Sequence, residues 1–295
     1  MKKQKIGAFD IVNISIFILL ALICIFPFYY IFINSISAND LVANGAISFL
    51  PKHVHFNNYL EVFKIQGLFP AFLVSIARTV VGTFFSVISA AFLGYALTKQ
   101  EFWLRKFWYR FVIITMYLSA GVIPAYLNIK NLGLLNSFWV YVLPALASPF
   151  NMILAKTYIE SIPPSLEESA ELDGASYLKR FFYVVLPIAK PIIATIAIFA
   201  AVGQWNSFMD TVMYMTKNNY YTLQYILYKY LNEVNTLAQM MQSNSSNMVS
   251  SAQLTLTPAS IRYTITAVTV LPILLVYPFF QRYIVKGVMI GAVKG

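Results

Sequence analysis

The stretch SLEESAELDGASYLKRFFYVVLP, residues 165–187, carries charges of both signs and a run of aromatic side chains between two strongly apolar stretches. Two prolines precede it, and Ser165 stands three residues before Glu168, which is the spacing of a capping box. Acidic side chains early in the segment complement a helix dipole, and Gly174 suits the left-handed residue that ends a helix. We therefore expect a short helix of roughly two turns over residues 166–173.

The remainder of this segment predicts how it joins the next apolar stretch. Ala170 and Ala175 are small and would let another surface approach closely, and Ser176 can cap a second short helix. Pro187 then opens the following apolar stretch at a position where proline is tolerated. One interpretation is an interfacial elbow that joins two spans. The other is a rigid plug that fits into a groove of a partner protein, which explains the two capped ends.

The composition places the chain in a membrane. Of its 295 residues, 59% are hydrophobic and 11% are charged, and the mean hydropathy is +0.68. A soluble domain needs more charge than this to cover its surface, so we expect an all-α polytopic membrane protein. The net charge of +10 comes from short basic clusters between apolar runs, which is typical of membrane topology and does not favour a nucleic-acid partner. A lone cysteine, Cys24, excludes a disulfide framework.

Six stretches are long and apolar enough to cross the roughly 30 Å of hydrocarbon. They are residues 11–33, 70–97, 111–129, 137–158, 188–209 and 261–284. The first is too long for the apolar region of a signal peptide, and we interpret it as an uncleaved span. With the N-terminus inside, 14 of the 21 Lys and Arg residues fall on the cytoplasmic side. Both termini and the segment 165–187 are therefore expected in the cytoplasm.

Prolines interrupt two of these stretches. Pro144 and Pro149 lie in the fourth, and Pro272 and Pro278 lie in the sixth. Each would remove a backbone donor from a helix and kink it. We expect these kinked helices to pack against other helices and to bend where a transport path opens.

A few polar residues inside or at the ends of the spans are candidates for a substrate path: Arg78, Trp205, Asn206 and Asp210. An aromatic ring beside amide and carboxylate groups suits a sugar. The alternatives are a snorkelling arginine and an aromatic anchor at the membrane interface. The pair His53 and His55 has no third ligand nearby, so we expect no metal site. The chain also contains no catalytic constellation and no phosphate-binding GxxxxGK[ST] loop, so we expect no enzyme activity.

The spacing within the opening stretch carries a resemblance. The pattern begins with Glu168-Ser169-Ala170 and, after three residues, continues with Gly174. After nine more residues comes Val184, and after one further residue comes Leu186-Pro187. This pattern resembles the EAA loop of ABC-importer permease subunits, with Ser169 in place of alanine and Val184 in place of isoleucine. The stretches 120–144, 205–210 and 285–295 are also similar to the second permease subunit of maltose-type importers, and among these to permeases for oligosaccharides from complex polysaccharides or glycans.

The resemblance implies a type I ABC importer permease fold in the bacterial plasma membrane. It implies one transmembrane domain over residues 1–295, with a first span at 11–34 and a five-helix permease core at 69–286 that includes a coupling loop at 161–187. Residues implied to couple to the ATPase are Ser165, Glu168, Ser169, Ala170, Asp173, Gly174, Ala175, Leu186 and Pro187. A second ATPase contact is implied at the C-terminus, by Gly291, Lys294 and Gly295.

The resemblance also implies the partners. They are a homologous second permease, a cytoplasmic ABC ATPase dimer that binds ATP and Mg²⁺, and an extracytoplasmic sugar-binding protein or lipoprotein, all at a lipid bilayer and without nucleic acid. The chain itself is expected to hold no cofactor. The long loop before the last span, with its polar stretch at 239–253, is expected to touch the sugar-binding protein; a disordered spacer is the alternative. Two other classes remain open from the residues: an ion-coupled secondary transporter and a membrane enzyme.

Overall fold

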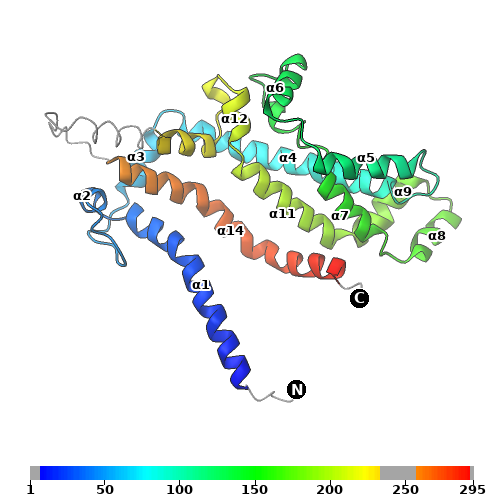
Figure 1. Cartoon of the computed structure of the whole chain (residues 1–295), viewed down its shortest axis with the longest axis horizontal. Helices are drawn as coiled ribbons and strands as arrows, with labels where there is room; N and C mark the ends of the chain where they lie inside the picture. The colour runs from blue at the N-terminus through cyan, green and yellow to red at the C-terminus, as the bar shows by residue number, and fades with distance from the viewer. Residues whose placement is uncertain (1–6, 233–256, 293–295) are drawn as a thin grey trace. The chain divides into compact units, whose positions relative to one another are not determined.

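A computed structural model describes residues 7–232 and 257–292 of the chain, and every regular element in these two ranges is a helix (Figure 1). Short helical pieces outnumber the long helices. The elements are α1 Ala8–Ser35, α2 Asn39–Ala43, α3 Asn57–Lys64, α4 Leu68–Ala96, α5 Arg105–Tyr117, α6 Val122–Asn131, η1 Phe138–Tyr141, α7 Pro149–Ile159, α8 Pro164–Leu172, α9 Tyr177–Arg180, the π-helix η2 Phe181–Val185, α10 Leu186–Ile188, α11 Lys190–Asn206, α12 Met209–Tyr214, η3 Asn218–Tyr220 and α14 Pro258–Ala292. Residues 223–232 are also helical.

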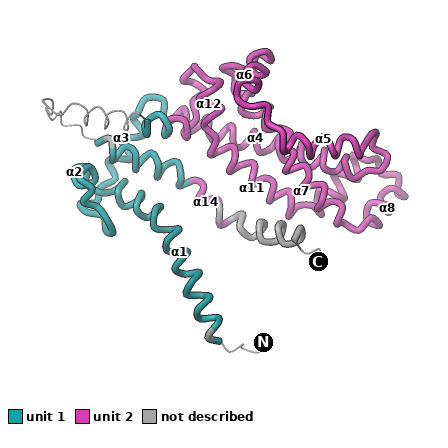
Figure 2. The backbone as a smooth tube through the Cα atoms, in the orientation of Figure 1, with its two compact units in different colours: residues 1–68, 227–271 teal, residues 69–226, 272–295 magenta. Residues whose placement is uncertain are grey.

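The chain divides into two compact units, residues 1–68 with 227–271 and residues 69–226 with 272–295 (Figure 2). In the first unit, Ile33, Val42 and Ile47 are buried together and Tyr263 of α14 packs on them. The backbone carbonyl of Ser35 there accepts a hydrogen bond from the buried Asn58 amide at 3.0 Å. All the candidate site residues described below belong to the second unit.

Three described helices are long and apolar enough to cross a membrane: α1, α4 and the part of α14 over Ala259–Val276. Most α1 side chains are exposed, which suits a helix whose solvent is lipid. Two further pairs of helices pass the same test only when joined across a sharp bend. These are α5 with α6, bent by 119°, and Tyr177–Ile188 with α11, bent by 83°. The described residues thus hold three to five candidate spans, and the predicted six helices and cytoplasmic termini stay predictions.

The predicted fourth span is wrong as a continuous helix. Residues 137–158 form the 3-10 helix η1, a series of turns and then α7, which has only 11 residues. Pro144 lies in the turns, and Pro149 begins α7, where the missing N–H costs no helix hydrogen bond. The side chain of Ser148 accepts from the backbone N–H of Asn151 at 3.5 Å and caps this start. In contrast, Pro272 and Pro278 lie inside α14, as predicted.

The predicted third span also breaks. Helix α5 ends at Tyr117, and the chain turns through Gly121, whose φ is +85°, before α6 begins. A left-handed residue cannot continue a right-handed helix, which explains the bend at this point. The sequence interval 111–129 contains no charged residue and is mostly apolar, so its mean hydropathy did not reveal the break.

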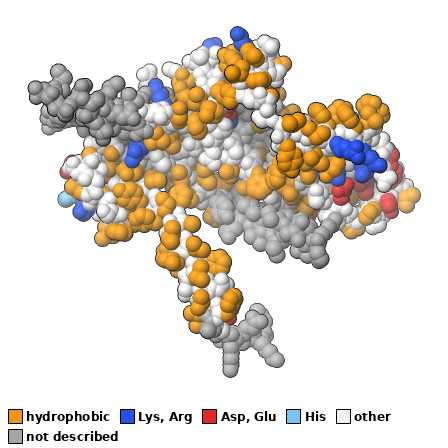
Figure 3. Space-filling model, viewed as in Figure 1, with side chains coloured by type: hydrophobic (Ala, Val, Ile, Leu, Met, Phe, Trp, Pro, Cys, Tyr) orange, Lys and Arg blue, Asp and Glu red, His pale blue; other side chains and the backbone are white. Residues whose placement is uncertain are grey.

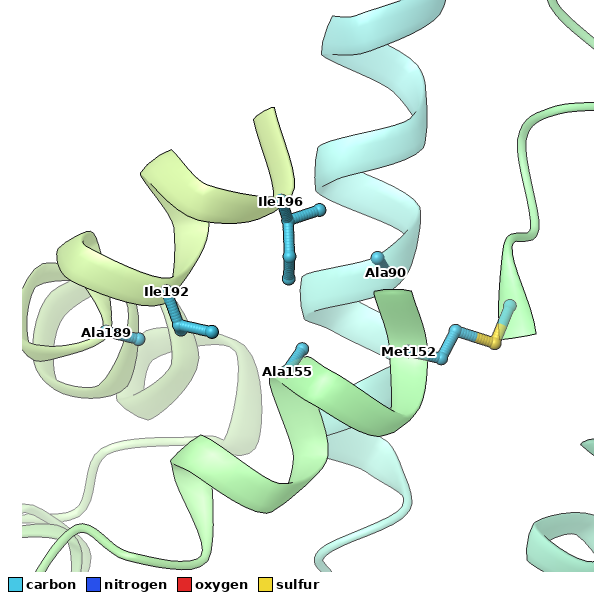
Figure 4. Close-up of a cluster of buried hydrophobic side chains, with 6 residues drawn as sticks. All are labelled: Ala90, Met152, Ala155, Ala189, Ile192 and Ile196. Carbon is cyan, nitrogen blue, oxygen red and sulfur yellow. The ribbon is translucent and has the colours of Figure 1, made fainter. Parts of the chain in front are cut away.

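The core of the second unit lies where α4, α7 and α11 meet (Figure 4). Its buried members are Ala90, Met152, Ala155, Ala189, Ile192 and Ile196. Gly94 permits the close approach of α4 to α7, because a Cβ atom added there would lie 2.9 Å from the Ala155 Cβ and 3.0 Å from the Met152 carbonyl oxygen. Any larger side chain at this position would push the two helices apart.

Candidate functional site

The segment at residues 161–187, which we call the EAA-like segment, contains the predicted short helix. This helix, α8, runs from Pro164 to Leu172. Its C-terminal end is a Schellman turn: Gly174 has φ +78°, its N–H bonds to the Glu171 carbonyl at 2.9 Å, and the Ala175 N–H bonds to the Ala170 carbonyl at 2.9 Å. The prediction of a two-turn helix ended by Gly174 is confirmed.

The predicted start of α8 is wrong in detail. The N-cap residue is Pro163, and Ser165 is already the second residue of the helix, so the capping box with Glu168 does not form. Pro164 explains the shift, since its fixed φ and missing N–H favour the first helical position. The hydroxyl of Ser169 donates instead to the Ser165 carbonyl at 2.8 Å.

One side of α8 is anchored by charge pairs that sequence reasoning missed. The Glu167 carboxylate accepts hydrogen bonds from the Tyr95 hydroxyl, near the end of α4, and from the Lys99 ammonium, three residues after that helix ends. The Glu171 carboxylate accepts from Arg180 at 2.5 Å, and the Arg180 guanidinium, 5% exposed, stacks 4.2 Å above the Tyr177 ring. The only sequence signal was the coincidence of acidic and basic residues within one short segment. Helix α8 is therefore tied both to α4 and to α9, beside which it lies (Figure 1).

The other side of α8 faces outward. Leu172, which was not among the predicted coupling residues, is 90% exposed. Several predicted coupling residues are exposed as well: Ser165, Glu168, Ser169, Asp173 and Gly174. The two small residues that were expected to face outward, Ala170 and Ala175, are half-buried. The exposed residues of α8 therefore include two large apolar side chains, Leu166 and Leu172, among polar ones, while the two alanines are only partly exposed.

The joint between the EAA-like segment and α11 also differs from expectation. Pro187 was expected to open the fifth span, but it lies in the short helix α10, directly after the half-buried Leu186. The chain then bends by 83° at Ala189, between α10 and α11. Upstream, Phe181 and Val185 of the π-helix are buried against α4 and α7. The segment thus reaches the long helices through buried aromatic and aliphatic contacts as well as through ion pairs.

A second polar site surrounds Arg78, which lies on α4 and is 2% exposed. Its guanidinium makes five hydrogen bonds: two to the Gln204 amide oxygen at 3.1 and 3.0 Å, one to the Ser207 carbonyl at 3.2 Å, and two to the Asp210 carboxylate at 3.2 and 2.6 Å. Five is the full number of N–H groups that an arginine carries. We call Arg78, Tyr141, Gln204, Ser207 and Asp210 the Arg78 cluster.

Tyr141 completes this cluster. The Arg78 guanidinium lies 4.2 Å from the centre of the Tyr141 ring, and the Gln204 amide donates to the Tyr141 carbonyl at 2.9 Å. The Tyr141 hydroxyl donates to the Tyr220 carbonyl at 2.6 Å and lies 3.0 Å from the Thr211 hydroxyl. Because Arg78 binds groups on both α11 and α12, it holds the turn between these helices. Of the predicted path residues, the structure brings Arg78 and Asp210 together and buries Arg78, so its guanidinium does not snorkel.

The two other path candidates, Trp205 and Asn206, lie between Gln204 and Ser207 in the chain but do not bind the Arg78 guanidinium. Trp205 packs edge to face on Phe72, with ring centres 6.3 Å apart, and lines an apolar cavity of about 260 Å³ with residues of α4, α11 and α14. Asn206 is exposed and accepts a hydrogen bond from the Gln224 amide at 3.2 Å. The assignment of these residues to a sugar path stays a prediction.

Some predicted sites fall outside the described residues. The loop stretch 239–253 and the terminal residues Lys294 and Gly295 do so, and of Gly291 only its place near the end of α14 is described. Within the described ranges, no three His, Cys, Asp or Glu side chains lie close enough together to hold a metal ion.

Comparisons with known proteins give relatives along the whole chain. Residues 82–290 match the family described as "Binding-protein-dependent transport system inner membrane component". The chain is 33% identical to the polygalacturonan/rhamnogalacturonan transport system permease protein YtcP of Bacillus subtilis (strain 168), over 99% of this chain and 100% of that protein. It is 35% identical to protein LplC of the same organism, over 100% of this chain and 98% of that protein.

A solved structure is also similar. A chain of a bacterial ABC transporter involved in the import of the acidic polysaccharide alginate aligns with a TM-score of 0.82 and 30% identity. The alignment covers 96% of this chain and 99% of that chain.

Proposed function

This chain belongs to the family of binding-protein-dependent transport system inner membrane components, and from this premise we propose that it forms half of the translocation path of an ATP-driven oligosaccharide importer. It is a permease subunit of an ABC importer and a multi-pass protein of the bacterial plasma membrane. Permease subunits of this kind are not themselves enzymes, and we assign ATP hydrolysis, with its ATP and Mg²⁺, to a separate ATPase dimer. Family membership does not favour the alternative of an ion-coupled secondary transporter.

The observation that carries the coupling proposal is the two-sided character of α8. Its Glu167 and Glu171 side chains bind α4 and α9, while Leu172 and Glu168 point away from the protein. A push on the exposed side would pass through Glu167 and Tyr95 into α4, a helix of 29 residues. We infer that the exposed side fits into a groove of the ATPase and that α4 receives the motion.

The substrate and the remaining partners follow from the relatives. The relative YtcP is named for the transport of polygalacturonan or rhamnogalacturonan, and the solved neighbour belongs to a transporter involved in the import of alginate. An oligosaccharide is accordingly the substrate class that we propose, delivered by an extracytoplasmic binding protein. A homologous second permease would supply the other half of the path. Trp205, Asn206 and Asp210 would border it, and the buried Arg78 would hold Asp210 in place.

Copurification tests this proposal directly. The tagged chain, purified from its native membranes, is expected to bring an ABC ATPase and a second permease of the same family, both identified by mass spectrometry. The variants Gly174→Pro and Glu168→Lys are expected to insert normally but to lose the ATPase and the uptake of oligosaccharides derived from pectin. Lys130→Gln, on the exposed surface of α6, is the control. Normal uptake in both coupling variants would disprove the role of the EAA-like segment.

Two further contacts are proposed for regions that, apart from Gly291 at the end of α14, lie outside the described residues. Residues 239–253 would touch the sugar-binding protein, and Gly291, Lys294 and Gly295 would touch the ATPase. Deletion of 239–253 is expected to reduce the stimulation of ATP hydrolysis by loaded binding protein in proteoliposomes. Full stimulation after the deletion would make this stretch a spacer.

A further inference from the structure

The connection from α4 to α5 gathers basic and aromatic side chains around one pocket. The pocket has a volume of about 670 Å³, and its lining includes Phe102, Leu104, Arg105, Lys106, Phe107 and Arg110. Figure 3 shows Lys and Arg side chains grouped beside hydrophobic ones over α5. None of these residues belongs to the EAA-like segment or to the Arg78 cluster.

The positive charges of this pocket are not neutralised within the described part of the protein. Arg105 directs one N–H to the Thr98 carbonyl at 3.1 Å, a neutral acceptor. Neither Lys106 nor Arg110 makes a hydrogen bond or an ion pair with another described residue. Glu101 is exposed and does not line the pocket. Three cations that share one pocket repel each other, so the pocket favours an anion.

The rim of the pocket indicates where this anion comes from. Of its aromatic lining residues, Phe102 is 39% exposed and Phe107 is 56% exposed, and Trp103, which follows Phe102 in the chain, is 71% exposed. Leu104, with φ +51°, adopts a left-handed conformation that is uncommon for leucine, and it is 51% exposed. Exposure of these apolar side chains to water is unfavourable. At a bilayer surface, by contrast, aromatic rings lie at the level of the lipid headgroups and basic residues contact lipid phosphates.

The direction of α5 supports the same source. The helix begins at Arg105 with basic residues and continues with the apolar run 111–116, so its first turn suits the interface and its later turns suit hydrocarbon. We propose that this pocket binds the phosphate of an anionic membrane phospholipid, such as phosphatidylglycerol. Lys106 and Arg110 contact the phosphate, and the aromatic rim lies against the upper acyl chains. This inference needs only the membrane location of the chain.

The test uses the intact purified chain in neutral detergent. Trp103 and Trp108 report binding, because brominated phosphatidylglycerol quenches nearby indoles. The double variant Lys106→Gln/Arg110→Gln is expected to bind phosphatidylglycerol on the order of 10-fold more weakly, since each basic residue near anionic lipid contributes about a few-fold. Lys130→Gln/Lys217→Gln, which removes two exposed cations elsewhere, is expected to bind like the unaltered chain.

Three results would overturn the proposal. They are equal binding of brominated phosphatidylcholine and phosphatidylglycerol by the unaltered chain, unchanged phosphatidylglycerol binding in the pocket variant, and equal losses in both double variants. Inorganic phosphate is added as a competitor, and full displacement of the lipid by phosphate alone would identify a site for free phosphate instead. The melting temperature of each variant is measured alongside, and an unchanged value attributes the loss of binding to the pocket rather than to misfolding.

Discussion

The Arg78 cluster and the anchor of α8 both combine a cation, a carboxylate and a tyrosine, but in different surroundings. The anchor of α8 consists of the contacts of Glu167 and Glu171 with Tyr95, Lys99 and Arg180, together with Tyr177 beside Arg180. The Arg78 side chain is 2% exposed and that of its partner Asp210 is 21% exposed. At the anchor, the Lys99 and Glu167 side chains are 19% and 18% exposed, and that of Glu171 is 60% exposed.

This difference in exposure separates two roles. A buried arginine with all five donors satisfied has nothing left for a ligand, and breaking its ion pair leaves an uncompensated charge. At the anchor of α8, Lys99 and both carboxylates are partly exposed to solvent even though Arg180 is buried. Ion pairs that are partly solvated are weaker and exchange partners with water at little cost. The Arg78 cluster therefore suits a fixed joint between α4, α11 and α12, whereas the anchor of α8 suits an element that must respond to a partner.

The largest expected change in stability comes from disrupting the Arg78 cluster. Arg78→Met leaves the Asp210 carboxylate and the Gln204 amide without their donor, and should lower the free energy of unfolding by about 3–5 kcal/mol. Thermal melting followed by tryptophan fluorescence measures this loss. Arg78→Met combined with Asp210→Leu should recover much of the stability, because no buried charge remains. If Arg78→Met melts like Lys130→Met, which removes an exposed cation, then the Arg78 cluster is not a structural joint.

The second effect concerns the anchor of α8. Glu167→Gln removes the negative charge that Lys99 and Tyr95 share, and should cost about 1 kcal/mol because the site is only partly shielded from water. The rate of uptake should fall strongly although the loss of stability is small, because α8 would remain bound to the ATPase but lose its link to α4. Melting and uptake are measured on the same preparation. Glu168→Gln, an exposed neighbour, should leave melting unchanged; an equal shift in both variants would argue against the anchor.

A third effect tests the end of α8. Gly174→Ala places a Cβ on a residue with φ +78°, which costs about 1 kcal/mol through the backbone alone, since an added Cβ meets no atom within 4 Å. Gly174→Asn is the matched control, because asparagine tolerates the left-handed conformation. Melting should rank glycine above asparagine and asparagine above alanine. An alanine variant as stable as the glycine form would show that this turn is not under backbone constraint.

The smallest effect on stability is expected at the exposed face of α8. Leu172→Ser removes a side chain that is 90% exposed, so the melting temperature should not change. The ATPase, however, should copurify in a smaller amount. Leu132→Ser, which removes another exposed leucine from the end of α6, should change neither quantity. Full recovery of the ATPase with Leu172→Ser would move the docking surface away from this residue.

Local stereochemistry explains what could be predicted. Helix α8 and its end at Gly174 depend on residues within one short segment, and the glycine is needed by the backbone itself. The start of α8 was predicted wrongly, and the cause is also local. Pro164 takes the first helical position, so Ser165 lies inside the helix and cannot act as its N-cap. The partners of Arg78 were beyond such reasoning, because they lie 126 and 132 residues further along the chain.

By itself, the sequence determined that this chain is a helical membrane protein, where its EAA-like segment lies, and that this segment resembles the coupling loop of importer permeases. Composition, apolar length and motif spacing are properties of the chain alone, so no packing was needed to recognise them. Only the tertiary structure decided that residues 137–158 are broken and that Glu167 rather than Glu168 anchors α8. Which carboxylate meets a cation depends on how α4, α7 and α11 pack, and that packing follows from the summed contacts of residues far apart in the chain.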